Sequence, residues 1–292
     1  MLPWIAYATI ALVWGSTYFA IAVGLQSFTP YGMVAFRFIG GGLLAVLLSR
    51  LRREILPDRA DLPHLMLTGA LMLSGSNALV TWSERHVTSG LAATVCAMVP
   101  LFLALFSGER QGTRTWVGLG FGLLGVAVLA DPLHGDVHWL GLGALLLANV
   151  LWAFATLHGK HHVKQHQSSF GNTAVQMLTA AGLGSLLAPL TGGFTVAPIT
   201  LKAGLAVGYL AVFGSVIAFS AYVYLARVWP PAKMGTYAYL NPLVAVILGG
   251  LLLREPFTWA TGLGLVLILG GVALVQLRPK VRLLPRVAGD TP

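Results

Sequence analysis

The chain has 292 residues, of which 57% are hydrophobic and only 9% are charged, and its mean hydropathy is +0.80. Soluble globular domains carry about 25% charged residues, so this composition excludes a water-soluble domain and indicates an integral membrane protein. The formal charge of +9 does not indicate nucleic-acid binding, because the basic residues are scattered along the chain instead of gathering in one segment.

Ten apolar stretches follow one another along the chain, and each is close to the ~20 residues with which a helix crosses a bilayer. They lie at residues 4–25, 31–49, 63–82, 88–107, 116–130, 138–158, 170–190, 201–225, 233–253 and 258–277. The predicted fold class is therefore an all-α integral membrane protein with ten transmembrane helices.

The segments between the stretches carry most of the basic residues, which alternate by side as the positive-inside rule requires. If the amino terminus is inside, the outer segments hold only Arg85, Lys202 and Arg254. The inner segments hold Arg50, Arg52, Arg53, Arg59, Arg110, Arg114, Lys160, Lys164, Arg227, Lys233, Arg278, Lys280, Arg282 and Arg286. We therefore expect both termini to be cytoplasmic.

The chain contains an internal repeat. The segment "SGLAATVCAMVPLFLALF" (89–106) aligns with "PAKMGTYAYLNPLVAVIL" (231–248), which places Pro100 on Pro242, and Trp14 pairs with Trp152 at an offset of 138. Five spans per copy is an odd number, so the second copy enters the membrane from the opposite side, as in the inverted repeats of many secondary transporters. The predicted division is residues 1–135 for the first repeat, 136–280 for the second, inverted repeat and 281–292 for a cytoplasmic tail.

Pro100 and Pro242 lie midway along the fourth and ninth spans. A proline removes one backbone donor, so we expect the carbonyls of Cys96 and Ala238 to be freed near the membrane centre. Lipid tolerates this only where neighbouring groups or a watery cavity supply partners. A packing kink without a ligand is the alternative, but two prolines at repeat-related positions favour a binding site at the repeat interface.

Polar and aromatic residues within the spans recur at spacings of three or four, which places them on single helical faces. The faces that we expect to line a cavity carry Trp14, Tyr18, Ser74, Asn77, Thr81, Pro100, Asn149, Trp152, Tyr222, Tyr237 and Asn241. The alternative is that the polar residues hold helices together, at about 0.6 kcal/mol per hydrogen bond. For tryptophans at span ends, such as Trp116, an interfacial belt is the better interpretation.

Arg37 is the only charged residue clearly inside a span, and an ionisable residue there is a functional hypothesis by default. It lies about two turns from the outer end of the second span, however, where a long side chain reaches the interface or helix-end carbonyls. We favour that structural role, with capture of a substrate carboxylate as the alternative. Its repeat equivalent, Gln176, is uncharged.

The sequence gives no support for a cofactor, a metal site or an enzyme. A tract of four histidines, which has the composition of a metal site, contains no acidic residue or cysteine; it comprises His158, His161, His162 and His166. The chain has no HExxH or GxSxG motif, and its nine acidic residues fall in loops, span ends or the tail.

Four motifs resemble the EamA-type transporters of the drug/metabolite transporter superfamily. They are "ALVWGSTYFA", "AFRF", "VPLFLALFSGERQGTRTWVGLGFGLLGVAVL" and "NPLVAVILGGLLLREPFTWATGLGLVLILGGVALV". In length and aromatic content the chain is similar to the YddG-like amino-acid exporters of that family. The resemblance implies a bacterial inner-membrane carrier that exports amino acids or related metabolites. It also implies that the fifth and tenth spans lie at a homodimer interface or at an outer position.

The expected cavity lining mixes aromatic rings with amide and hydroxyl groups and contains no carboxylate. This favours a small neutral or zwitterionic solute, such as an amino acid with an aromatic or apolar side chain, which would be exported by alternating access. Because a permanent cation would more naturally meet an acidic residue, a multidrug or organic-cation exporter of the same superfamily is the alternative. The expected partners are this small molecule and the lipid bilayer, without nucleic acid.

Overall fold

The computed structural model describes residues 1–107, 112–129, 138–163, 169–228 and 237–276. Within these ranges the chain is helical, and an isolated bridge between Phe28 and Thr195 is its only β-type pairing. The predicted cytoplasmic tail lies outside the described residues. The all-α class that hydropathy predicts is therefore confirmed.

Every predicted span coincides with one helix or with a consecutive series of helical segments. In chain order these are α1 (Leu2–Gly24), α2 (Pro30–Leu51), α3 (Leu62–Thr68), η1 (Gly69–Ser76), α4 (Asn77–Ser83), α5 (Ser89–Cys96), α6 (Val99–Phe106), α7 (Thr113–Leu129), α8 (Trp139–His162), α9 (Ser169–Leu187), η2 (Pro189–Thr191), α10 (Leu201–Tyr209), η3 (Leu210–Ile217), α11 (Ala218–Val228), α13 (Tyr237–Leu248), η4 (Gly249–Leu253) and α14 (Trp259–Gln276). Among the described residues, five helical runs are long and apolar enough to cross a membrane, and two of them include a π-helical segment.

Threonine side chains begin several of these helices. Thr29 accepts a hydrogen bond from the backbone nitrogen of Gly32 at the start of α2, and Thr200 accepts one from Ala203 at the start of α10. Such caps satisfy backbone donors that have no partner within the helix. Because Pro30 follows Thr29 directly and lacks a backbone donor, the first turn of α2 loses nothing by containing it.

Several spans are interrupted, and the interruptions differ in kind. The third and eighth spans contain the π-helical segments η1 and η3. The fourth span breaks between α5 and α6, at Ala97 and Met98, shortly before Pro100. The ninth does not break at its proline: α13 continues through Pro242 to Leu248. A single proline removes one hydrogen bond, and the turns on either side of Pro242 are enough to continue the helix.

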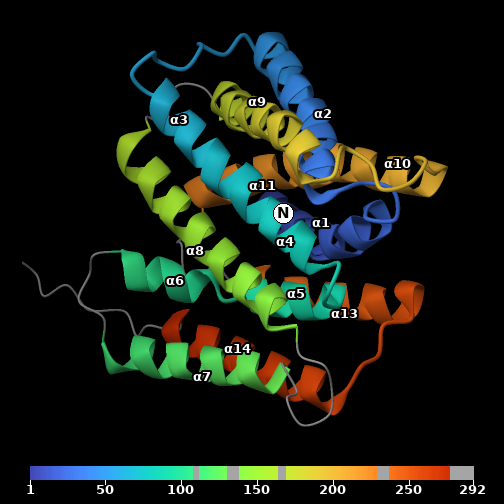
Figure 1. Ribbon diagram of the computed structural model, residues 1–292. Helices are drawn as coiled ribbons and strands as arrows, with labels where there is room; N and C mark the ends of the chain where they lie inside the picture. Colours follow the sequence, from blue (N-terminus) through green and yellow to red (C-terminus); the bar gives the residue numbers. More distant parts are fainter. Residues whose placement is uncertain (108–111, 130–137, 164–168, 229–236, 277–292) are drawn as a thin grey trace, which may run out of the picture.

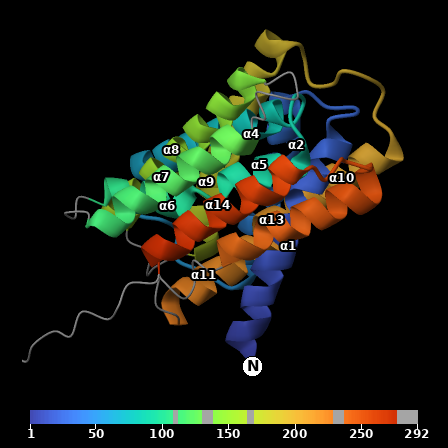
Figure 2. The ribbon, with the colours of Figure 1, turned by 90° about the horizontal axis from the view of Figure 1, so that it is seen from below.

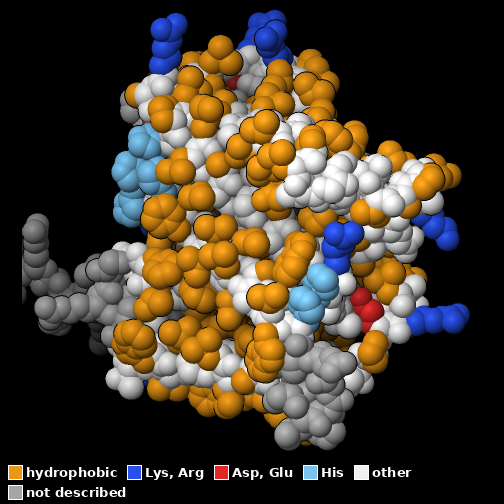
Figure 3. Space-filling view, viewed as in Figure 1, with side chains coloured by type: hydrophobic (Ala, Val, Ile, Leu, Met, Phe, Trp, Pro, Cys, Tyr) orange, Lys and Arg blue, Asp and Glu red, His pale blue; other side chains and the backbone are white. Residues whose placement is uncertain are grey.

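Two helix pairs form opposite edges of the bundle. In Figure 1, α2 and α9 lie together at the upper edge, and α7 and α14 lie together at the lower edge, with the other helices between them. Figure 2 shows the same bundle from below, with α13 beside α1. Apolar side chains are spread over the whole face that Figure 3 shows, while most lysine and arginine side chains lie at its upper and right-hand margins. This distribution suits a surface surrounded by lipid.

Small residues allow α7 and α14 to approach closely. A methyl group added at Gly271 of α14 would lie 2.5 Å from the carbonyl oxygen of Gly118 in α7. One added at Gly125 of α7 would lie 2.7 Å from the Ile268 side chain. Helices in lipid associate largely through such close packing, because lipid tails are as apolar as the helix surface and the hydrophobic effect does not favour their association.

We expect Gly271→Ala to destabilise the protein by about 1–3 kcal/mol, because the new methyl group forces α7 and α14 apart. The matched control is Gly270→Ala, where an added Cβ meets no described atom within 4 Å. Thermal unfolding of the detergent-solubilised protein would measure both variants. The melting temperature should fall for Gly271→Ala alone, and equal shifts in the two variants would contradict the close-packed seam.

Candidate functional site

A cavity of about 140 Å³ lies in the middle of the bundle, between helices of the first and second halves of the chain. Its described lining residues are Trp14, Thr17, Tyr18, Ile21, Arg37, Ser76, Asn77, Val80, Ala93, Cys96, Ala97, Val99, Pro100, Ala148, Asn149, Trp152, Tyr237, Ala238 and Asn241. An apolar protein cavity of roughly 150 Å³ accommodates benzene, so this cavity has room for a ring-sized group.

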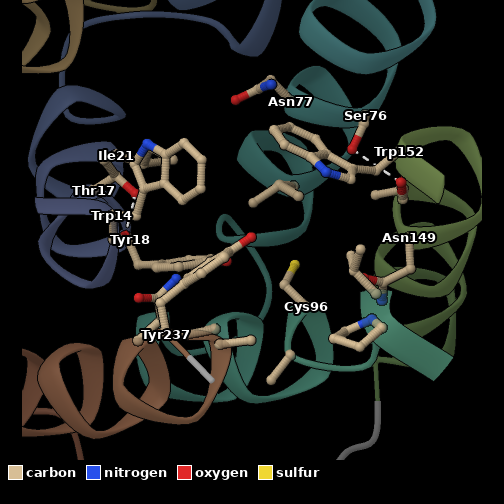
Figure 4. Close-up of a pocket in the computed structure, with 18 of the residues that line it drawn as sticks. Trp14, Thr17, Tyr18, Ile21, Ser76, Asn77, Cys96, Asn149, Trp152 and Tyr237 are labelled. Atoms are coloured by element: carbon tan, nitrogen blue, oxygen red, sulfur yellow. Dashed lines mark hydrogen bonds between the residues drawn. The ribbon is translucent and has the colours of Figure 1, made fainter. Parts of the chain in front are cut away.

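The structure brings together most of the residues that the sequence predicted to face a cavity. Eight of the eleven line it: Trp14, Tyr18, Asn77, Pro100, Asn149, Trp152, Tyr237 and Asn241. Figure 4 shows Trp14 and Tyr18 from α1 on one side, and Asn149 and Trp152 from α8 on the other. Tyr222 lies behind the wall, with its ring centroid 5.3 Å from that of Trp14 and 6.0 Å from that of Tyr237.

Ser74 and Thr81 do not line the cavity, although both are buried. We grouped them with Asn77 on one face by assuming an uninterrupted α-helix. The π-helical segment η1 ends between Ser74 and Asn77, and its wider turn shifts the face that continues into α4. As a result, the cavity-lining residues of this span are Ser76, Asn77 and Val80.

Three aromatic rings form one wall and its support. The indole nitrogen of Trp14 donates a hydrogen bond to the carbonyl oxygen of Gly214, 3.0 Å away. The Trp14 ring also meets Tyr237 edge-on at 5.3 Å between centroids, and Tyr237 meets Tyr222 at 90°. Edge-to-face pairs of this kind contribute about 0.5–1.5 kcal/mol each beyond area burial. The rings are therefore held in place before any solute enters.

Amide and hydroxyl groups at the cavity mostly bind backbone carbonyls of neighbouring helices. Asn149 donates to the carbonyl oxygen of Val95 at 3.0 Å, and Ser76 donates to that of Ala148 at 2.9 Å. The amide of Asn241, oriented so that its nitrogen donates, reaches the carbonyl oxygen of Ala11 at 3.2 Å. These groups hold helices together and line the cavity at once. The side-chain oxygen of Asn149 has no partner among the described residues.

Arg37 turns into the bundle and does not have the structural role that we favoured from the sequence. Its side chain is buried, and it lines the cavity. Its Nε donates to the hydroxyl of Ser215 at 3.0 Å, and its Nη1 donates to Oδ1 of Asn77 at 3.1 Å. Among the described residues, its hydrogen bonds go to these two side chains and none goes to a helix-end carbonyl.

Two acidic residues follow spans near the same end of the bundle. Glu255 accepts hydrogen bonds from the backbone and the hydroxyl of Ser89, at the start of α5. Glu84 follows α4 and is buried, with neither carboxylate oxygen hydrogen-bonded to a described residue. Burial and the nearby Glu255 raise the pKa of Glu84 well above its usual value, which favours its uncharged form. Neither residue is among those that line the cavity.

Sequence reasoning missed Thr17, Ile21, Val80 and Cys96 as lining residues. Thr17 and Ile21 could have been found, since they follow Trp14 at three and seven positions along α1. Small and apolar residues such as Ala93 carry no polar signal that separates a cavity wall from helix packing.

The histidine tract is partly described. His158 lies with His64 of α3, their ring nitrogens 3.0 Å apart, and the ring centroids of His158 and His162 are 4.4 Å apart. His166 lies outside the described residues. Among the residues that the structure describes, no three His, Cys, Asp or Glu side chains are arranged to hold a metal ion.

Comparison with known proteins identifies the family. The EamA-like transporter family matches this chain twice, over residues 2–130 and 139–277. The uncharacterized inner membrane transporter YedA of Escherichia coli is 38% identical over 277 residues, which cover 93% of this chain and 90% of YedA. A probable terminal-alkyne amino-acid exporter of Streptantibioticus cattleyicolor is 28% identical, over 94% of this chain and 93% of that protein.

One solved crystal structure has a TM-score of 0.66 and 22% sequence identity, covering 94% of this chain and 96% of the other, so the two share a fold. The family match covers both halves of the chain, and the apolar helices are those expected of an inner membrane transporter such as YedA. The chain belongs to the EamA-like transporter family, and it is a multi-pass inner-membrane transporter and not an enzyme.

Proposed function

We propose that this transporter exports small zwitterionic metabolites, foremost amino acids with aromatic or apolar side chains. The observation that carries the proposal is the cavity lining, which combines aromatic rings, amides and one guanidinium with no carboxylate among the described residues. Rings such as Trp14 and Trp152 suit an apolar side chain, while the polar groups suit the charged end of an amino acid. The probable amino-acid exporter among the relatives supports the same class of solute.

We further propose that transport proceeds by alternating access between two inverted repeats, residues 1–135 and 136–280. The cavity draws its walls from both halves of the chain: α1, α2, η1, α4, α5 and α6 belong to the first half, and α8 and α13 belong to the second. In inverted-repeat carriers, a site at the repeat interface becomes accessible from either side when one repeat rocks against the other. A central cavity with walls from both halves is what this mechanism requires.

An organic-cation exporter is the second candidate, because Trp14, Tyr222 and Tyr237 form a cluster of rings that could attract a cation. Cation–π attraction reaches about 2 kcal/mol at a desolvated site. Against this candidate stands Arg37, a positive charge on the wall of the same cavity. We therefore rank zwitterions first.

Counterflow into liposomes that contain the purified protein would test the class of solute. We expect L-phenylalanine, L-leucine and L-methionine to exchange, and quaternary organic cations to exchange at least about tenfold more slowly, a difference of about 1.4 kcal/mol. The control is liposomes without protein. Preferential exchange of the cations would support the second candidate and reject the first.

Variants of the aromatic wall should lose transport without losing protein. We expect Trp152→Ala and Tyr237→Ala to reduce amino-acid flux about tenfold, because each removes a ring that lines the cavity. Trp116→Ala is the control, since Trp116 lies on α7 outside the cavity and is 58% exposed. Membrane abundance is measured alongside flux, and a parallel loss of both would assign these rings to folding.

The proposed orientation, with both termini in the cytoplasm, rests on the alternation of basic residues between the two sides. In a Cys96→Ala background, we expect Val196→Cys to react with a membrane-impermeant maleimide in intact cells. Leu56→Cys should react only after the membrane is disrupted. Both positions are exposed in loops, Val196 between α9 and α10 and Leu56 between α2 and α3. The reverse labelling pattern would invert the topology.

A further inference from the structure

Arg37 is a buried cation whose hydrogen-bond partners are neutral. The guanidinium lines the cavity, and its recorded partners are the Ser215 hydroxyl and the Asn77 amide oxygen. No acidic side chain is among the described residues that line the cavity. Removing a charge from water costs several kcal/mol unless an opposite charge or water compensates it. The Phe38 ring, whose centroid lies 5.0 Å from the guanidinium carbon, compensates part of this cost. Because no carboxylate lines the cavity among the described residues, the cavity side of Arg37 suits an anion.

The two partners of Arg37 are themselves fixed by π-helical turns. The side-chain nitrogen of Asn77 donates to the carbonyl oxygen of Met72 at 3.0 Å, and the hydroxyl of Ser215 donates to that of Leu210 at 3.0 Å. Both contacts span five residues, across η1 and η3 respectively. Because these donors bind backbone carbonyls, Asn77 Oδ1 and Ser215 Oγ face Arg37 as acceptors. They orient the guanidinium; the Ser215 hydroxyl has no further donor, whereas the Asn77 amide keeps one N–H.

These turns occupy equivalent places in the two halves of the chain. Met72 and Leu210, and likewise Asn77 and Ser215, are separated by the same 138 positions that separate Trp14 from Trp152. Arg37 is therefore held by one partner from each half. The residue of α9 that pairs with Arg37, Gln176, lies one position beyond this offset. It donates to the hydroxyl of Thr68 at 2.9 Å and does not line the cavity. The two halves therefore supply equivalent π-helical turns, but only the first half places a charged side chain, Arg37, between them.

The remaining donors of Arg37 match a carboxylate. A guanidinium has five N–H donors, and the hydrogen bonds to Ser215 and Asn77 use one on Nε and one on Nη1. The second N–H of Nη1 and both on Nη2 remain, and these are the groups that bind a carboxylate through two parallel hydrogen bonds. The rings of Trp14 and Trp152 line the same cavity, where an apolar group attached to that carboxylate would fit.

We propose that Arg37 binds the carboxylate of the transported solute, and that Asn77 and Ser215 position its guanidinium. The ligand class is a small monocarboxylate that carries a ring-sized apolar group. This inference rests on the proposed function in one respect, namely that the central cavity is the transport site. It holds whether or not the solute also carries an amino group.

The test compares an acid with its amide in reconstituted liposomes. We expect the wild-type protein to exchange L-phenylalanine at least tenfold faster than L-phenylalaninamide. Arg37→Gln should lower phenylalanine exchange tenfold or more without lowering phenylalaninamide exchange, which removes the preference. An equal loss for acid and amide, or an unchanged preference, would overturn the proposal.

Ser215→Asp provides a second variant that keeps the arginine. It places a carboxylate beside Nε of Arg37, where it competes with the solute's carboxylate. We expect it to lower phenylalanine exchange tenfold or more. Because it also removes the hydroxyl that donates to the Leu210 carbonyl, the folded fraction is measured alongside. Unchanged phenylalanine exchange would overturn the proposal. The matched control is Gln176→Met, which changes the equivalent position of the other half and should keep the wild-type preference for the acid.

A different measurement separates this inference from amino-acid export as such. If the wild-type protein exchanges neither phenylalanine nor its amide, thermal unfolding is measured with 3-phenylpropionate and with phenethylamine as probes. Stabilisation of the wild type by 3-phenylpropionate alone, lost in Arg37→Gln, would support carboxylate binding although amino-acid export had failed. Absence of stabilisation by the carboxylate would overturn it.

Discussion

A polar group that leaves water for a bilayer must find its partner inside the protein, and the interior of this transporter is organised around that constraint. An unpaired carbonyl in hydrocarbon costs several kcal/mol. The carbonyls of Met72 and Leu210 accept hydrogen bonds from Asn77 and Ser215, each five residues later across a π-helical turn. The same side chains that satisfy these carbonyls then accept from Arg37, so backbone satisfaction and the placement of a charge are one network.

The same constraint connects helices that are distant in sequence. Asn149 of α8 donates to Val95 of α5, and Trp14 of α1 donates to Gly214 of η3. A side chain that joins two helices in this way can also face a cavity, as Asn149 and Trp14 do. The two explanations that the sequence left open for such residues, helix association and cavity lining, are therefore compatible. Only a transport measurement on a folded variant separates their contributions.

Hydropathy predicted the ten spans well because the length of a membrane helix is set by bilayer thickness and not by long-range contacts. Periodicity placed Trp14, Tyr18 and Tyr237 at the cavity because α1 and α13 are regular there. It misplaced Ser74 and Thr81 because a π-helical turn shifts the helical face and has no simple residue signature. The environment of Arg37 was beyond sequence reasoning, since its partner Ser215 lies on the eighth span.

Arg37 is the one charged residue among the described residues that line the cavity, and it affects anionic and cationic solutes in opposite ways. It attracts a carboxylate, and it raises the free energy of an organic cation that enters the same space, because two like charges repel strongly where the dielectric constant is low. The ring cluster of Trp14, Tyr222 and Tyr237 would offset part of that repulsion for a cation, by about 2 kcal/mol at most. Asn77 and Ser215, one from each half of the chain, hold the guanidinium at the wall of the cavity. On this physical basis, a carrier for zwitterions and one for cations can share the same fold and differ in one side chain.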